Sequence, residues 1–488
     1  MRFTLLKIAT LSSFISTAVS QTAYANDFVD PDYILAKNFT PSTYQAQLTA
    51  VKWARTLAAK GPWSVVNKKA TPPSGDIHDY MSWAPYWWPD CSNAGNTTAL
   101  TPEQIWVTCN YVSRDGKFNP DVRLTVNNVG DFSDMAEAVF YNALAWVFDL
   151  RDVVPFDKST YEKNAVRFIR AWFLDADTKM NPNLDYGQMQ RGPDGQVGSH
   201  TGVLDLKSFA KVASAILILR KGGSTEWTKD LDDQMVAWSK EYINWLETAK
   251  IAIEEREATN NHGSFYFNQL AALKLVVGDT QGAKDVTNAF FDGIYMNQIV
   301  ASGEQVCYLL DFPLEAARTR PYHYRAYNLA AMITNARIAQ YADANTNVWK
   351  KTTTAGATIK SALDFAMTIS AATSDETSYA SELYPNIAAV ASVYGDADGK
   401  YVSFIKAAYP GFMTEPFVLW NQPFAEGEAS GLAPTSTGKT VKAAAATGGT
   451  KSGSSSSGKD QENGAVGLST AGPLGFLVSL LLVGFVNL

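Results

Sequence analysis

The sequence predicts an all-α protein with one folded domain, and three observations lead to this fold class. Apolar residues recur at helical spacing from Asp27 to about Gly431, with almost no strand-like alternation. The segments with this spacing are roughly three to five turns long. The connections between them are short, as in antiparallel helix pairs. Because no short repeat is exact, this periodicity fits both an α-solenoid and an α/α toroid.

The predicted helices follow one another along the domain. The sequence Ser159-Thr160-Tyr161-Glu162 has the form of a capping box and predicts the start of a helix that continues to Phe173. Another helix is expected over residues 206–219, with Gly222 at its end. The remaining predicted helices cover residues 134–150, 231–246, 264–277, 280–295, 322–341, 354–369 and 387–393.

Both ends of the chain have the features of targeting signals. Residues 1–25 combine early basic residues, an apolar stretch and small residues before Ser20 or Ala25, which predicts a cleaved secretory signal. Residues 431–463 are rich in Ser, Gly and Thr and predict a disordered linker. Asn463 precedes small residues and an apolar end, so residues 464–488 match the propeptide of a GPI anchor attached at Asn463.

The alternative for the C-terminal end is a transmembrane helix, but an apolar run of about thirteen residues is short for a bilayer. Residues 26–430 are therefore expected to form the single domain. We expect a secreted monomer at the cell surface, anchored by lipid to the outer leaflet of the plasma membrane or to the cell wall.

Composition and cysteine content restrict the possible partners. A net charge of −7 without Lys/Arg clusters argues against nucleic-acid binding. The sequons NFT at Asn38 and NTT at Asn96 fit a secreted glycoprotein. Cys91 and Cys109 bracket a loop and are expected to form a disulfide, which leaves Cys307 free. No His or Cys spacing resembles a metal site, and we expect neither a metal nor another cofactor.

An aromatic loop covers residues 74–90, SGDIHDYMSWAPYWWPD, where the prolines prevent a continuous helix. So many amphipathic rings in a polar loop exceed what filling a core requires, and we expect a wall that stacks on sugar rings. Any single ring could equally pack onto the core. The rings assigned to this wall are Tyr80, Trp83, Tyr86 and Trp87.

Two further segments place polar side chains where helices are predicted to begin. In TNNHGSFYFNQ, Asn260, Asn261 and His262 precede an apolar run, where free N–H groups and the helix dipole favour an anion. In AARTRPYHYRAYN, Arg318 and Arg320 precede a proline in the first turn. These arginines can hold a carboxylate and lower the pKa of a nearby tyrosine. Taken alone, the first segment is equally a helix cap and the second a surface ion-pair cluster.

Amides, arginines, a tyrosine and a histidine together are the groups that β-elimination at a uronic acid requires. The C5 proton becomes removable only when the adjacent carboxylate is neutralised, because charge develops on it in the enolate-like transition state. A base then removes that proton, and an acid protonates the leaving O4.

Four blocks in this order resemble the alginate-lyase-domain family of polysaccharide lyases: GDIHDYMSWAPYWWPD, NPNLDYGQMQRG, NNHGSFYFNQLAALKLVVGD and EAARTRPYHYRAYNLAA. The resemblance spans residues 62–416 and implies one α/α toroid or incomplete barrel. It implies that Asn261 and Arg318 neutralise the carboxylate and that Tyr324 protonates O4. His262 either is the base or orients the substrate, so that Tyr324 and His262 both remain candidates for the base.

The resemblance also implies a substrate-binding set around these residues. Tyr186 and Gln188 belong to the block that lies at the cleft in this family, and Asn260 and Arg320 are second choices for binding the carboxylate. His200 departs from the family pattern, since Thr-Gly follows it. We assign it to substrate binding, with a structural loop histidine as the alternative.

The expected substrate is a 1,4-linked acidic polysaccharide. Mannuronate and glucuronate share their arrangement at C4 and C5, so alginate or polymannuronate and glucuronan fit equally, and the endo or exo mode stays open. Two other classes of function are possible. A glycoside hydrolase would use two carboxylates, for which Asp76, Asp79 and Asp185 are available. A binding protein without turnover would keep only the aromatic loop.

Overall fold

Helices that are buried on nearly all sides form an inner layer. They are α4 (Asn128–Val147), α6 (Phe209–Lys221), α9 (Asn261–Val276), α12 (Pro321–Ala342) and α14 (Tyr384–Tyr394). Each contacts the next in this order, α4 with α6, α6 with α9, α9 with α12 and α12 with α14. Their apolar residues surround the helix axis instead of forming one stripe, as expected for helices without a solvent-facing side.

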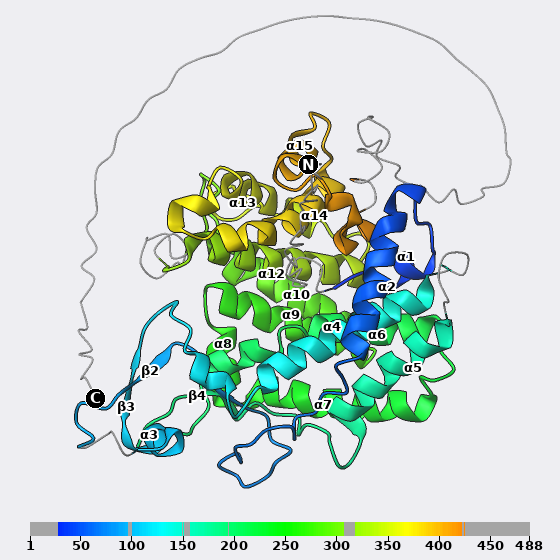
Figure 1. Ribbon diagram of the computed structural model, residues 1–488. Helices are drawn as coiled ribbons and strands as arrows, with labels where there is room; N and C mark the ends of the chain where they lie inside the picture. Colours follow the sequence, from blue (N-terminus) through cyan, green and yellow to red (C-terminus); the bar gives the residue numbers. More distant parts are fainter. Residues whose placement is uncertain are drawn as a thin grey trace, which may run out of the picture. The chain divides into compact units, whose positions relative to one another are not determined.

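An outer layer consists of helices with one buried face. These are α2 (Tyr44–Ala58), α5 (Lys158–Ile169), α7 (Lys229–Thr248), α10 (Thr280–Asp292), α13 (Ile359–Ala366) and α15 (Lys400–Ala408). Helix α5 packs on α4, α7 and α10 pack on α9, and α13 packs on α12. Inner and outer helices thus alternate along the chain, which is the α/α toroid among the two predicted architectures (Figure 1).

The ends of the domain meet in this arrangement. Helix α2 contacts the 3-10 turns Phe412–Thr414 and Pro416–Leu419, and the second of these turns also contacts α14. The first long helix of the domain therefore packs against its last turns. The described residues also form three shorter α-helices, which are α1 (Pro31–Leu35), α3 (Pro102–Thr108) and α8 (Lys250–Arg256).

The computed structural model describes residues 28–95, 100–148, 150, 157–193, 195–306, 318–421 and 424. The secretory signal, the sequon at Asn96, Cys307, the linker and the attachment site Asn463 lie outside these ranges. The sequon residue Asn38 lies within them and is exposed. Within these ranges no helix is both long and apolar enough to cross a bilayer.

Two strands lie in residues 74–90, which were expected to be a loop, and each pairs with a strand from another part of the chain. Strand β1 (Met81–Trp83) pairs in parallel with β4 (Tyr186–Met189), and β2 (Trp87–Asp90) pairs antiparallel with β3 (Asn110–Ser113). The predicted disulfide between Cys91 and Cys109 is confirmed, with an S–S distance of 2.03 Å. It joins the strand ends of a β2–β3 hairpin, which Figure 1 shows beside α3 at one edge of the molecule.

Several helix boundaries differ from the prediction for local reasons. The capping box at Ser159 is wrong, because the Asp157 carboxylate caps α5 and accepts the backbone N–H of Ser159 at 3.0 Å. Helix α10 ends earlier than expected, at Asp292, where Gly293 follows. Helix α13 begins later, at Ile359, because Thr358 forms a capping box with Ser361.

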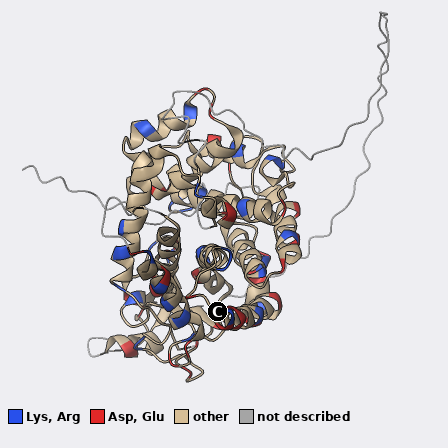
Figure 2. Cartoon of the chain, turned by 90° about the vertical axis from the view of Figure 1, so that its right-hand side faces the viewer, with Lys and Arg blue, Asp and Glu red and all other residues tan. Residues whose placement is uncertain are grey.

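The surface carries charges of both signs. In Figure 2, Lys and Arg residues are interspersed with Asp and Glu residues over the part of the chain that the structure describes. An acidic polymer would therefore be recognised by local groups within a cavity.

Candidate active site

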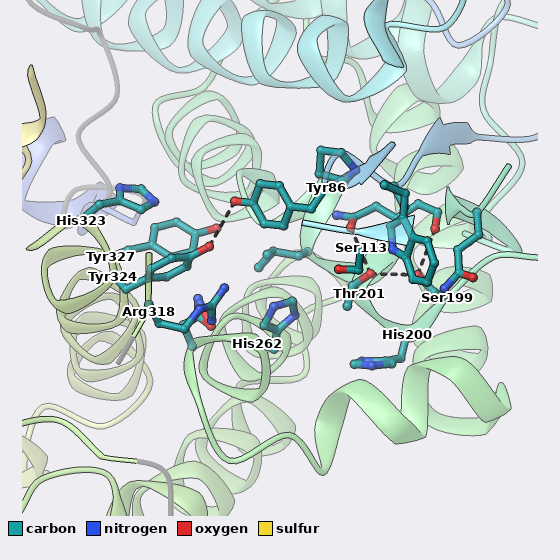
Figure 3. Close-up of a pocket in the computed structure, with 17 residues that line it drawn as sticks. Tyr86, Ser113, Ser199, His200, Thr201, His262, Arg318, His323, Tyr324 and Tyr327 are labelled. Carbon is teal, nitrogen blue, oxygen red and sulfur yellow. Dashed lines mark hydrogen bonds between the residues drawn. The ribbon is translucent and has the colours of Figure 1, made fainter. Parts of the chain in front are cut away.

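A cavity of about 480 Å³ lies where the aromatic loop meets the N-terminal ends of α9 and α12 (Figure 3). Its volume falls within the roughly 300–1,000 Å³ typical of small-molecule sites. The residues that line it include Tyr86, Trp87, Gln188, His200, Asn261, His262, Arg318, His323, Tyr324 and Tyr327. The structure thus brings together Asn261, His262, Arg318 and Tyr324, which the sequence analysis had assigned to one site.

Helix α9 presents a buried amide to this cavity. The Asn260 side chain caps the helix, its Oδ1 accepting the backbone N–H of His262 at 3.1 Å. The next residue, Asn261, is only 1% exposed. Within the part of the chain that the structure describes, neither its Oδ1 nor its Nδ2 has a hydrogen-bond partner. A buried amide without partners is costly, on the order of 1–3 kcal/mol, and a ligand carboxylate that accepts from Nδ2, with a ligand hydroxyl that donates to Oδ1, would remove this penalty.

A single buried carboxylate anchors two histidines of the cavity. The Nδ1 atoms of His262 and His200 lie 2.6 Å from Oε1 and Oε2 of Glu255, respectively. The Glu255 side chain is 0% exposed, so these imidazoles supply its main polar environment. With Nδ1 donating to the carboxylate, the second nitrogen of each ring, Nε2, is left as the hydrogen-bonding or basic atom.

The charges in this trio shift the pKa values of two members. Burial favours a raised pKa for Glu255, but the two imidazoles outweigh it and the pKa lies below its ordinary value. The hydrogen bond that His200 Nδ1 donates to Glu255 raises the pKa of His200. The buried carboxylate therefore favours the protonated form of His200.

Helix α12 carries Tyr324, the tyrosine that the sequence analysis assigned to the reaction. The hydroxyl groups of Tyr324 and Tyr86 are 3.1 Å apart, and Arg320 Nη2 donates to Tyr86 at 2.7 Å. The guanidinium carbon of Arg318 lies 3.8 Å from the centre of the Tyr324 ring. Arg318 also pairs with Asp115 at 3.0 Å, which ties α12 to the chain segment after β3. Figure 3 shows Tyr86 extending toward Tyr324, with Arg318 and His262 below them.

The expected lowering of the tyrosine pKa by the arginines is wrong as a net effect. Arg318 and Arg320 do lower the pKa of Tyr324, but burial and the neighbouring Tyr86 hydroxyl outweigh them and raise it above the ordinary value. The phenol therefore stays protonated, which suits a proton donor better than a base in the resting enzyme.

The idea that helix N-termini themselves hold the substrate anion is also wrong for α12. The backbone N–H groups of Tyr322 and His323 donate to the Glu376 carboxylate at 2.9 and 3.0 Å. These N–H groups are therefore already satisfied by the protein. At α9 the N–H of His262 is likewise capped by the Asn260 side chain, so this N–H group is satisfied by the protein as well.

The aromatic loop divides between core and cavity. Tyr86 and Trp87 line the cavity. Tyr80 is 0% exposed, with its hydroxyl 3.1 Å from Asp205, and Trp83 is buried in a small cluster with Met189. Both were assigned to a sugar-stacking wall, and this assignment is wrong, because Tyr80 is buried and Trp83 belongs to β1, whose residues are all buried.

The other residues predicted to bind the substrate also differ in whether they line the cavity. Gln188 lines the cavity, where its Nε2 donates to Asp205 at 2.8 Å, whereas Tyr186 packs beside the same small cluster and does not line the cavity. His200 lines the cavity, and its contact with Glu255 holds the ring in place. Asn260 and Arg320 do not line it and serve as a helix cap and as a partner of Tyr86.

The carboxylates that a glycoside hydrolase would need lie elsewhere. Asp76 and Asp79 are bonded to Asn181, and Asp185 accepts the indole N–H of Trp245 at 2.8 Å. None of the three lines the cavity. Among the described residues, no cluster of three His, Cys, Asp or Glu side chains could hold a metal ion.

Comparison with known proteins agrees with this geometry. The alginate lyase family profile matches residues 64–377, most of the folded domain. The chain belongs to the alginate lyase family. This polysaccharide lyase also resembles a solved alginate lyase from Bacteroides ovatus with 28% identity and a TM-score of 0.67, over 82% of this chain and 99% of that one. No curated protein matches the chain.

Glu255 is the main site residue that the sequence analysis did not find. It lies on α8, and its partners His200 and His262 are 55 and 7 residues away. Asp115 and Glu376, which fix Arg318 and the start of α12, were missed as well. No spacing rule connects these acidic residues to their partners.

Proposed function

We propose that this lyase cleaves a 1,4-linked polyuronate by β-elimination, and that the substrate is either alginate (polymannuronate) or glucuronan. The observation that carries the proposal is the convergence of Asn261, His262, Arg318 and Tyr324 on one cavity. Each supplies one of the functions that the reaction requires.

Asn261 and Arg318 neutralise the substrate carboxylate. The Asn261 amide has no hydrogen-bond partner among the described residues, and Arg318 supplies positive charge on the same cavity wall. A protonated His200 adds positive charge nearby, since its ring centre lies 6.2 Å from that of His262. Donors fixed in a dry cavity stabilise a developing anion more strongly than water does.

His262 removes the C5 proton, and Tyr324 donates a proton to O4. The Glu255 bond to Nδ1 leaves Nε2 of His262 as the basic atom, and the raised pKa of Tyr324 keeps its phenol protonated. The electrons of the C5–H bond form a C4=C5 double bond as the C4–O4 bond breaks. The products are an unsaturated uronate at the new end and a free hydroxyl on the leaving sugar.

The test is a panel of polymannuronate, polyguluronate, glucuronan, hyaluronan and pectate, followed by ultraviolet absorbance of the conjugated double bond. We expect absorbance to rise with polymannuronate, glucuronan or both. Depolymerisation without new absorbance would assign hydrolysis and overturn the proposal. Binding without any chain cleavage would leave only a carbohydrate-binding role.

We propose further that the enzyme is secreted and held at the cell surface by a GPI anchor at Asn463. The support is the sequence pattern at the two ends of the chain. Treatment of intact cells with a phosphatidylinositol-specific phospholipase should release the activity. Asn463→Gln should prevent attachment of the GPI anchor. If the phospholipase still released enzyme from cells that make this variant, the assignment of Asn463 as the attachment site would be wrong.

A further inference from the structure

A second cavity of about 210 Å³ lies at the C-terminal end of α12, away from the site described above. Helices α1 and α14, the end of α12 and the Pro416–Leu419 turn with Trp420 surround it. Tyr324 and Arg337 are both on α12, thirteen residues apart, which separates them by roughly 20 Å at 1.5 Å per residue. Figure 1 shows α1 and α14 on the side of the molecule opposite to β2 and β3.

The second cavity contains a guanidinium that forms no ion pair with the described residues, although the Asp30 carboxylate lies in the same cavity and interacts with it electrostatically. Arg337 Nη2 donates to the amide oxygen of Asn421 at 2.8 Å, while its buried Nε has no hydrogen-bond partner among the described residues. Burial lowers the pKa of Arg337 to about 10, the sign of a guanidinium removed from water. Arg337 as a whole is partly exposed, but its Nε is buried, and a buried guanidinium donor without an acceptor favours a bound anion.

The walls of the second cavity are largely aromatic. Tyr33, Tyr341, Trp349 and Trp420 line it, and the indole N–H of Trp420 is a second buried donor that finds no partner among the described residues. Rings that offer a flat apolar face beside hydrogen-bond donors are suited to the carbon skeleton of a sugar. Two orphaned donors, Arg337 Nε and Trp420 Nε1, therefore border one aromatic cavity.

The size and charge of the second cavity limit its ligand. A volume of about 210 Å³ is below the roughly 300–1,000 Å³ of pockets for drug-sized ligands, which leaves room for one small ring. Asp30 also lines the cavity, with Oδ1 accepting the N–H groups of Asp32 and Tyr33 at 2.8 and 3.3 Å. One arginine beside one carboxylate does not attract a dianion such as phosphate strongly, so a single carboxylate fits better.

We propose that this second cavity binds one uronate ring, with its carboxylate near Arg337 and its ring against the aromatic walls. The ligand class rests on the proposed function, because the polymer and its cleavage products carry such rings. A second site on the far side of α12 does not extend the catalytic cleft. It holds a distant part of the same polymer, or a released chain end, and raises the local concentration of substrate.

The experiment uses the full chain labelled with 5-fluorotryptophan and observed by ¹⁹F NMR, with the Trp420 resonance assigned from Trp420→Phe. D-glucuronate is the probe, since a monosaccharide has no glycosidic bond to cleave, and D-glucose is the neutral control. We expect D-glucuronate to shift the Trp420 resonance and D-glucose to do so at least about tenfold more weakly. The reason is the charge-assisted hydrogen bond to Arg337.

Arg337→Gln should weaken the response to D-glucuronate about tenfold or more, and Arg337→Lys should give an intermediate response. Both variants should cleave short oligouronates at the rate of the unmodified enzyme. Equal responses to D-glucuronate and D-glucose would overturn the proposal, and so would an unshifted resonance or unchanged binding in Arg337→Gln. If Arg337→Gln does not fold, the responses of the unmodified enzyme to D-glucuronate and D-glucose still decide whether the second cavity prefers a uronate. A polymer panel without cleavage would remove the proposed function but leave the Trp420 response intact.

Discussion

Replacing Tyr324 by Phe removes a single hydroxyl group from the cavity and little else. The ring remains packed with Phe265, Tyr327 and Ala331, and Arg318 can still lie 3.8 Å from its centre. The lost contact is the 3.1 Å hydrogen bond to the Tyr86 hydroxyl. Tyr86 keeps the bond that it accepts from Arg320 at 2.7 Å, so no buried polar group is left without a partner.

The two expected effects differ greatly in size. Losing one neutral hydrogen bond costs about 0.5–1.5 kcal/mol of folding stability. Losing the proton donor to O4 costs about 10²- to 10⁴-fold in turnover, or roughly 3–5 kcal/mol at 1.36 kcal/mol per factor of ten. We therefore expect Tyr324→Phe to fold and to bind polymer within about tenfold, while kcat falls by at least about 10².

The assay is the initial rate of ultraviolet absorbance on polymannuronate and glucuronan, with polymer affinity measured separately. Tyr327→Phe is the matched control, because Tyr327 lies one turn further along α12 and lines the same cavity. The control should keep turnover within a few-fold. The assignment of the acid to Tyr324 fails if Tyr324→Phe turns over normally. It also fails if both variants lose activity alike, since that result would indicate general damage to the cavity.

Other substitutions test the remaining groups of the site. Asn261→Ala should lower kcat/KM by about 10²- to 10³-fold through loss of a donor to the carboxylate, and unchanged kinetics would exclude this role. Glu255→Gln should move the alkaline limb of the kcat/KM profile to lower pH, because Glu255 raises the pKa of His200 and keeps it protonated to higher pH. The stability from this pair is likewise present at low pH and lost as pH rises through the raised pKa. An unshifted limb would show that protonated His200 is not needed. Glu376→Ala should cost about 1–2 kcal/mol in thermal unfolding by uncapping α12 and should lower kcat more than it raises KM. Glu376→Asp should restore part of both, and a change in KM alone would argue against a positioning role.

The helical layers could be predicted because burial leaves a periodic trace in the sequence. Helix α9, for example, is apolar on all sides, and α10 has one buried face, so both were found close to their observed bounds. Helix boundaries depend on single capping residues, which the periodicity of apolar residues does not locate. Asp157 outcompeted Ser159 as a cap because its ionised carboxylate accepts hydrogen bonds from both the backbone and the Ser159 hydroxyl.

The sequence pointed to residues at helix starts that line the cavity, and it missed the acidic groups that contact them. Asn261 and Tyr324 stand in local patterns that a reader of the sequence can find. Glu255 meets His200 only because α8 is folded beside the 3-10 segment His200–Leu206. The arginines likewise suggested an acidic phenol, whereas burial of Tyr324, which no local pattern reveals, decides the direction of its pKa shift.

Contact between α2 and the turns Phe412–Thr414 and Pro416–Leu419 has a consequence for biosynthesis. During translation, the segment that covers α2 leaves the ribosome about 350 residues behind its future neighbour, and such long-range contacts form slowly. Until then, one flank of the nascent domain exposes apolar surface to chaperones and proteases. A premature stop codon ahead of Phe412 should therefore give a degraded polypeptide, even though every residue assigned to the reaction has already been synthesised.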